Sequence, residues 1–199
     1  MSVFYRVIRT LAWSLVRALF RLKSVGVQNV PKDQGIVLCC NHTSMTDIAF
    51  LVVTCRRQIY FMGKEELFHN KILGSFFKAM GAFSVKRGSG GAEAIDTAVN
   101  IIKEKKIMGI FPEGTRSKDG IPMRAKSGVA VIVSKTGAPV VPVSIYREGK
   151  LHLFCKVTIR YGEPIFSEEL TMQNDSRTEL KRVAELIMGR IVKLWEMKF

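Results

Sequence analysis

Short apolar runs rich in β-branched residues alternate with segments of helical length along most of the chain. This alternation predicts an α/β fold. The predicted strands are Gly35–Cys40, Gln58–Met62, Ile107–Phe111, Val140–Ile145 and Leu153–Tyr161. The predicted helices are Met1–Lys23, Met45–Val53, Ile72–Met80, Ala92–Lys105, Ser127–Lys135 and a closing segment from Ser176. A chain of 199 residues with 47% hydrophobic residues supports one such domain with a sizeable core.

A polar segment, Asn41–Asp47, follows the first predicted strand. We therefore expect His42 at the carboxyl end of a strand, the edge where ligands bind in open α/β sheets. If Asp47 lies in the first turn of the next helix, its carboxylate can reach an imidazole nitrogen and raise the basicity of the other one. A second interpretation involves no catalysis: Ser44–Asp47 fits a capping box with Ser44 as the N-cap. The residues alone leave both interpretations open.

The charge balance is strongly basic. The chain contains 31 Lys and Arg residues against 17 Asp and Glu, which gives a net charge of +14. This charge favours a polyanionic partner, such as nucleic acid, an anionic membrane, a phosphorylated substrate or an acidic carrier protein. The cations are dispersed and no nucleic-acid-binding motif is present, which argues against nucleic acid. A non-catalytic basic module that binds membrane or nucleic acid is the alternative from another class, although it has no need of His42 and Asp47.

The four cysteines, Cys39, Cys40, Cys55 and Cys155, form no CxxC pair. Neighbouring residues of a strand point to opposite faces, so Cys39 and Cys40 are expected on different sides of the sheet. Neither a zinc site nor a disulfide framework is indicated. We expect reduced, buried thiols in a cytosolic protein.

The N-terminal helix is predicted to be amphipathic. Arginines interrupt its apolar residues too often for a transmembrane span, and no apolar core or cleavage site of a signal peptide is present. One side of the helical wheel is polar and carries Arg6, Arg9, Thr10, Arg17 and Arg21. The other side is apolar and carries Phe4, Ile8, Leu11, Leu15, Ala18, Leu19 and Leu22. This pattern favours a helix in the membrane interface over one that packs only on its own domain.

Polar residues stand at the ends of several predicted strands. They are His42 with Asp47, Lys64, Arg87, and the segment Glu113–Arg116. Taken singly they have structural explanations: the cations could be solvated, and Phe111–Gly114 fits a type I turn with Pro at its second position. Together they would line one rim with a base, an acidic residue and several cations, which suits a phosphate-bearing substrate with a free hydroxyl.

The ordered motifs resemble the PlsC-type glycerolipid acyltransferases, which include the 1-acyl-sn-glycerol-3-phosphate acyltransferases. The resemblance rests on four blocks over about residues 35–145. They are Asn41-His42-x4-Asp47, Gly81–Arg87, Phe111–Ser117 and Val141-Pro142-Val143. The implied fold is a single α/β domain, a mixed and mostly parallel sheet flanked by helices. Residues 25–199 would form this domain, and residues 1–24 the interfacial helix.

The family resemblance implies roles for individual residues. His42 would be the general base that deprotonates the acceptor hydroxyl, and Asp47 would orient it. Three cations, Lys64, Arg87 and Arg116, would hold the acceptor phosphate. Glu113, Gly114 and Thr115 would shape the acceptor site. Backbone N–H groups near Gly114 or Ser44 are candidates for the oxyanion donor. No metal site is implied.

The resemblance also implies the partners. The expected reaction transfers a fatty acyl group from acyl carrier protein or coenzyme A to the sn-2 hydroxyl of 1-acyl-sn-glycerol 3-phosphate, giving phosphatidic acid. No bound cofactor is expected, because the thioester is a co-substrate. Other acceptors with the same chemistry are lyso-ornithine lipid, another lysophospholipid or glycerol 3-phosphate. The expected location is the cytoplasmic side of the cell membrane, as a peripheral protein held by an anionic surface.

Overall fold

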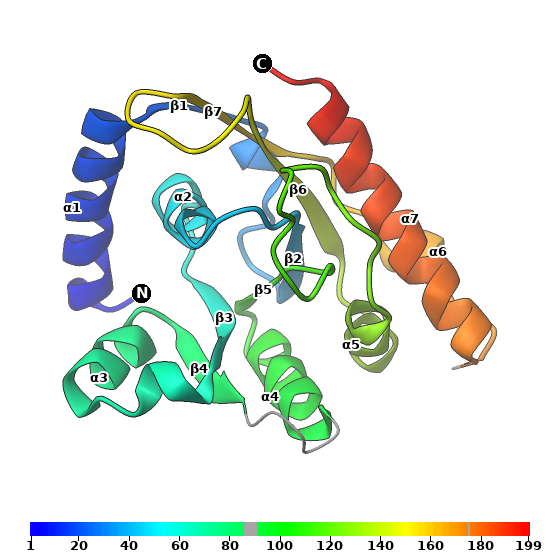
Figure 1. Ribbon diagram of the computed structural model, residues 1–199. Helices are drawn as coiled ribbons and strands as arrows, with labels where there is room; N and C mark the ends of the chain where they lie inside the picture. Colours follow the sequence, from blue (N-terminus) through cyan, green and yellow to red (C-terminus); the bar gives the residue numbers. More distant parts are fainter. Residues whose placement is uncertain (86–90, 175) are drawn as a thin grey trace.

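A seven-stranded sheet forms the centre of the computed structural model, which describes residues 1–85, 91–174 and 176–199 (Figure 1). The strand order is β1-β7-β6-β2-β5-β3-β4. Every neighbouring pair is parallel except β6 and β7, which are antiparallel. The strands are β1 (Arg21–Val25), β2 (Ile36–Cys40), β3 (Ile59–Lys64), β4 (Ala82–Val85), β5 (Ile107–Ile110), β6 (Val140–Arg147) and β7 (Lys156–Tyr161). The predicted α/β class with a mixed, mostly parallel sheet is confirmed.

Helices cover both faces of the sheet (Figure 1). The first face carries α1 (Val3–Leu19) and α2 (Thr46–Thr54). The second face carries α4 (Ala92–Lys103), α5 (Gly128–Thr136) and α7 (Arg177–Glu196). Helix α3 (Lys71–Ala79) lies against η2 (Glu65–Phe68) and β4, and two short helices, η1 (Val27–Asn29) and α6 (Ser167–Leu170), complete the described elements.

Within the described residues, no helix combines the length and apolar character needed to span a bilayer.

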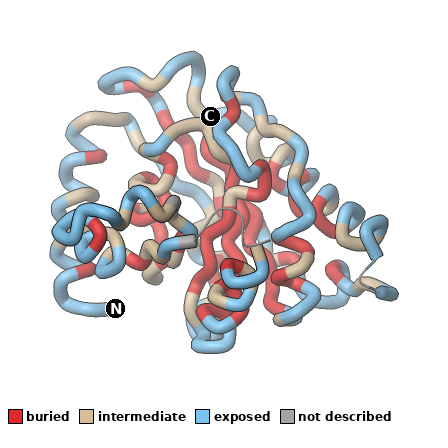
Figure 2. Tube along the Cα trace, turned by 60° about the horizontal axis from the view of Figure 1, so that its bottom comes forward, coloured by how far each residue is buried: buried red, intermediate tan, exposed pale blue. Residues whose placement is uncertain are grey.

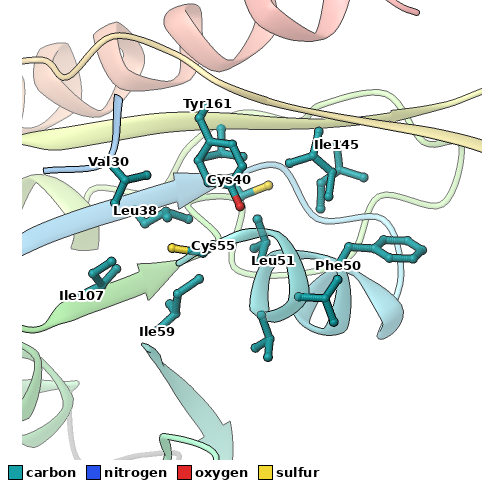
Figure 3. Packing of buried hydrophobic residues seen from close by; sticks show 14 of the residues in the cluster. Val30, Leu38, Cys40, Phe50, Leu51, Cys55, Ile59, Ile107, Ile145 and Tyr161 are labelled. Atoms are coloured by element: carbon teal, nitrogen blue, oxygen red, sulfur yellow. The ribbon is translucent and has the colours of Figure 1, made fainter. Parts of the chain in front are cut away.

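Alternate side chains of the central strands enter two separate cores. In β2, Leu38 and Cys40 pack in the core on the α1–α2 side, whereas Val37 and Cys39 pack in the core under α4, α5 and α7. Figure 3 shows Leu38 and Cys40 in the first core together with side chains of α2. Figure 2 shows the buried strands at the centre of the molecule.

All four cysteines are free and buried, as predicted. Burial raises the pKa of the Cys39, Cys40 and Cys55 thiols.

A crevice is expected where the chain leaves two adjacent central strands in opposite directions. Strands β2 and β5 are parallel neighbours. After β2 the chain enters α2 on the first face, whereas after β5 it reaches α5 on the second face. Such a divergence at the carboxyl ends of the strands is the switch point at which α/β proteins bind ligands. The segments after β2 and β5 carry His42 and Glu113–Arg116, respectively.

Two predicted boundaries are wrong. The N-terminal helix ends at Leu19 instead of continuing to Lys23, because Arg21–Val25 pairs with β7 as the edge strand β1. The predicted boundary between residues 24 and 25 therefore falls inside a strand. Strand β7 starts at Lys156 instead of Leu153, because Phe154 adopts a left-handed backbone conformation with φ of 61°, outside the range of regular strands.

Candidate active site

His42 and Asp47 face each other at the carboxyl end of β2. The Nδ1 atom of His42 lies 2.9 Å from Oδ2 of Asp47. The imidazole is partly accessible, with 13% of its side chain exposed, whereas the carboxylate of Asp47 is 1% exposed. When Nδ1 carries the proton and donates to the carboxylate, Nε2 is left as the basic nitrogen. The pair thus has the geometry of an oriented general base.

The carboxylate of Asp47 is also bound by the backbone at the start of α2. Oδ2 accepts hydrogen bonds from the N–H groups of Thr43 and Ser44, at 2.6 and 2.8 Å. These donors, together with the positive end of the helix dipole, stabilise its negative charge. The helix begins at Thr46, and Ser44 Oγ accepts from the N–H of Thr46 at 3.3 Å. Met45 precedes the helix but has a helical backbone, with φ of −62° and ψ of −26°. The bond to the Thr46 N–H and the bond from the Ser44 N–H to Asp47 are those of the expected capping box with Ser44 as N-cap.

The backbone of His42 is held from two sides by the segment after β5. Its N–H donates to Oε1 of Glu113 at 2.9 Å, and its carbonyl accepts from the N–H of Ser117 at 2.8 Å. The preceding residue, Asn41, is fully buried and binds β6 with both ends of its amide. Its Nδ2 donates to the carbonyl of Ile145 at 3.0 Å, and its Oδ1 accepts from the Ile145 N–H at 2.8 Å. These four bonds fix the position of the imidazole relative to the sheet.

Glu113 is buried, with only 3% of its surface exposed. Burial raises the pKa of its carboxyl group, and the backbone N–H of His42 opposes this shift. Within the described residues, its Oε2 atom has no hydrogen-bond partner and no hydrogen bond joins the carboxylate to Arg116. Glu113 therefore acts on the site through the backbone of His42.

A stack of aromatic rings supports the imidazole. The ring of Phe111 lies 3.9 Å from that of His42, centroid to centroid, with the planes 15° apart. Phe61 of β3 continues the stack, 5.8 Å from Phe111. Gly109 makes room for this arrangement, because a Cβ atom there would lie 2.4 Å from the Phe61 ring. The aromatic rings fix the plane of His42.

The segment after Glu113 turns outward and exposes polar groups. Gly114 closes a turn by donating its N–H to the carbonyl of Phe111 at 3.0 Å, and its φ of 69° favours glycine. Gly114, Thr115 and Arg116 are exposed. The aliphatic chain and ammonium group of Lys126 lie against Gly114, which adds a second cation to this segment. Lys126 is itself fixed by donating its N–H to the carbonyl of Pro112 at 2.8 Å.

The two remaining predicted cations are only partly located. Lys64 ends β3, and its backbone is paired with Val85 at the same sheet edge as His42. The side chain of Lys64 lies outside the described part of the structure, and so does the whole of Arg87. In the part of the chain that is described, no group of three or more His, Cys, Asp or Glu side chains is arranged to hold a metal ion.

The oxyanion donor was expected among backbone N–H groups near Gly114 or Ser44, and the N–H groups of these two residues themselves are already bound. The N–H of Gly114 is bound to the carbonyl of Phe111, and the N–H of Ser44 is bound to Asp47. Both bonds are local and belong to the turns that shape the site. The bond from Gly114 to Phe111 closes the four-residue turn that was predicted over Phe111–Gly114. An oxyanion donor near these residues stays a prediction.

Three residues of the site had not been singled out from the sequence: Asn41, Phe111 and Lys126. Asn41 and Phe111 lie inside motifs that were recognised. The motifs therefore located these residues near the site but did not predict which groups they contact. Lys126 lies nine residues after the Phe111–Ser117 motif, in a segment with no regular pattern. Only the fold of the loop after β5 brings it to Gly114.

The chain is similar in sequence to known acyltransferases. A family model described as Acyltransferase matches residues 21–146, more than half of the chain. The 1-acyl-sn-glycerol-3-phosphate acyltransferase of Bacillus subtilis is 33% identical over 183 residues, which cover 87% of this chain and 87% of that protein. That of Borreliella burgdorferi is 29% identical over 135 residues, but the match spans only 54% of its length.

A solved structure has a similar fold over nearly the whole chain. It is the crystal structure of PlsC, the 1-acyl-sn-glycerophosphate (LPA) acyltransferase from Thermotoga maritima. The match has a TM-score of 0.74 at 25% sequence identity and covers 98% of this chain and 80% of the other.

Proposed function

Because the chain belongs to the PlsC-type acyltransferase family, we propose that it acylates the sn-2 hydroxyl of 1-acyl-sn-glycerol 3-phosphate and forms phosphatidic acid. The acyl group comes from a thioester of acyl carrier protein or coenzyme A. The observation that carries this proposal is the His42–Asp47 pair, 2.9 Å apart at the switch point of the sheet. The exposed Arg116 lies on the adjacent segment after β5.

The reaction needs no covalent enzyme intermediate. Nε2 of His42 takes the proton of the acceptor hydroxyl as that oxygen attacks the thioester carbonyl. The carbon–sulfur bond then breaks, and the imidazolium returns the proton to the departing thiolate. Asp47 keeps Nδ1 protonated and stabilises the imidazolium, as the acid does in a serine-hydrolase triad. A base of this kind typically contributes about 10²–10⁴ in rate.

The acceptor phosphate is held by cations at the rim of the site. Arg116 presents a planar guanidinium that can bind a phosphate with two parallel hydrogen bonds. Lys126 adds a charge beside Gly114. Lys64, by its position in the family, and Arg87, at the end of the Gly81–Arg87 motif, complete the proposed set. Glu113 shapes the acceptor site by holding the His42 backbone, and Gly114 and Thr115 form its exposed edge.

Membrane contact through α1 supplies the lipid substrates. One side of α1 packs on the protein through Tyr5 and Val16, which are buried. Its other side exposes Phe4, Leu11 and Leu15. An apolar surface of this kind, next to exposed arginines, fits a peripheral helix in the headgroup layer of an anionic membrane. No nucleic acid takes part in the proposed function.

An acyl-transfer assay with a panel of acceptors tests the proposal. A labelled acyl thioester, on carrier protein or on coenzyme A, is offered with lysophosphatidate, lyso-ornithine lipid or glycerol 3-phosphate. We expect transfer to lysophosphatidate. Transfer only to another acceptor would keep the mechanism and replace the substrate. No transfer to any acceptor would favour a non-catalytic basic membrane-binding module.

The phosphate clamp makes a separate prediction. Replacing Arg116 with Ala should raise the KM for lysophosphatidate by about tenfold or more, because a hydrogen bond to a charged group typically contributes about 1.5–3 kcal/mol. The KM for the thioester should change little. Arg177→Ala, on an exposed arginine at the start of α7, serves as the control and should change neither. An equal rise in both KM values for Arg116→Ala would contradict the clamp.

A further inference from the structure

Helix α3 has an unusual surface for a short helix at the edge of a domain. Three of its apolar residues are exposed: Ile72 is 82% exposed, Leu73 51% and Phe76 38%. Gly74 is its buried position, and a Cβ there would lie 2.9 Å from the backbone of Phe68 in η2. The helix is therefore packed tightly on one side while these three apolar side chains are exposed.

The apolar surface of α3 continues onto α1. The rings of Phe4 and Phe76 are in edge-to-face contact, with centroids 6.4 Å apart and planes at 82°. From Phe4 the exposed apolar residues of α1 run along the helix through Val7, Leu11 and Leu15. Figure 1 shows α3 beside the N-terminal end of α1, and Figure 2 shows that much of this side of the molecule is exposed.

Helix α3 also lies near the sheet edge that carries His42. Helix α3 follows β3 and η2, and the carboxyl end of β3 lies at the same sheet edge as His42, because β2, β5 and β3 are parallel neighbours. The first turn of α3, which carries Ile72 and Leu73, therefore starts from that edge. A layer that contacts both helices would lie next to the site.

The charges around this surface favour an anionic bilayer as its occupant. Neither α1 nor α3 contains an Asp or Glu residue. Exposed cations flank the apolar residues: Arg6 and Arg17 on α1, and Lys71 and Lys78 on α3. The acidic residues nearest to α3 in the sequence are Glu65 and Glu66 of η2. Apolar anchors bordered by cations are the pattern of helices that lie in the headgroup layer of anionic lipids.

We propose that α3 and the exposed side of α1 form one membrane-inserting surface, with Ile72, Leu73 and Phe76 as anchors beside the active-site edge. This inference rests on the proposed function, since the bilayer is the source of the lysophosphatidate. It assigns to α3 the task of placing the site at the depth where the acceptor hydroxyl lies. Helix α1 alone would bind the membrane without setting this distance.

Vesicle binding by the full-length protein tests the inference. The probe is vesicles of phosphatidylcholine mixed with phosphatidylglycerol, and the variant is Ile72→Asn with Leu73→Asn. The lipid concentration for half-maximal binding should rise by about tenfold or more, because burial of each such side chain typically contributes a comparable factor. Ser75→Asn, an exposed position on the polar side of α3, is the matched control and should bind as the wild type does.

Activity and size measurements separate the possible outcomes. With a soluble short-chain acceptor, the double variant should retain wild-type transfer, because its substitutions lie outside the site. Vesicle binding by the double variant at the wild-type level would overturn the proposal. A wild type that sediments as a dimer and a double variant that sediments as a monomer would also overturn it, because a second copy of the chain would then cover this surface. The single variant Ile72→Asn repeats the test if the double variant fails to fold. Loss of vesicle binding with no transfer by the wild type would uphold this surface and reject the proposed function.

Discussion

At the scale of single residues, Asp47 makes both of the contacts that the sequence presented as alternatives. Its Oδ2 atom accepts from His42 Nδ1 and from the N–H groups of Thr43 and Ser44. The carboxylate therefore caps the start of α2 and orients the imidazole with the same oxygen. A capping contact and a contact with the imidazole coincide here because the helix N-terminus lies directly beside the end of β2.

Phe111 provides a test of how precisely His42 must be held. Phe111→Leu keeps an apolar side chain but removes the ring stacked on the imidazole. We expect kcat to fall by up to about tenfold with little change in the acceptor KM, because such ring pairs contribute about 0.5–1.5 kcal/mol. Steady-state kinetics measure both values. Phe83→Leu, in β4, removes a partly buried ring elsewhere and is the control; equal losses in the two variants would contradict a positioning role for Phe111.

At the scale of elements, the sequence predicted best where burial was complete. Residues of β2 and β5 are buried along their whole length, so their apolar runs were unambiguous. The edge strand β1 was missed because four of its five residues are exposed, and Leu22 continued the helical pattern of α1. The four motif blocks located the main chain of the site, but the bonds of Asn41, Glu113 and Lys126 depend on contacts between distant segments. Such contacts have no signature in a single sequence.

The packing of β3 against β5 makes a prediction for this scale. A Cβ atom at Gly109 would lie 2.4 Å from the Phe61 ring and 2.6 Å from the Ile59 side chain. Gly109→Ala should therefore lower the free energy of unfolding by about 1–3 kcal/mol, the usual cost of overpacking. Denaturant unfolding measures this change. Gly189→Ala on α7, where a Cβ meets nothing within 4 Å, should instead be neutral or stabilising by up to about 1 kcal/mol. An unchanged stability for Gly109→Ala would show that the two strands are not packed this closely.

At the scale of the whole molecule, the net charge of +14 bears on how the protein meets its substrate. A basic surface raises the local concentration of anionic lipid but does not define the reaction. The proposed acceptor is itself anionic, so the positive charge of the protein attracts both the membrane surface and the acceptor. Charge composition alone left nucleic acid, an anionic membrane, a phosphorylated substrate and an acidic carrier protein open as partners.

Salt should therefore weaken membrane binding by the whole protein. Between 0.1 M and 1 M salt the Debye length falls from about 10 Å to about 3 Å, which screens exposed charges. Binding to vesicles that contain phosphatidylglycerol should weaken markedly across this range, as measured by co-sedimentation. Binding to vesicles of phosphatidylcholine alone should be weaker at low salt and should change little. Salt-independent binding to the anionic vesicles would show that apolar insertion alone holds the protein.

The central claim is that His42 acts as the base of an acyl transfer, and one comparison tests it most directly. The rate of transfer from a labelled acyl thioester to lysophosphatidate is measured for the wild type and for His42→Ala, with vesicle binding and unfolding recorded for both. We predict a rate lower by about 10²–10⁴ in the variant, with binding and stability close to those of the wild type. A variant that folds, binds vesicles and transfers the acyl group at the wild-type rate would contradict the claim.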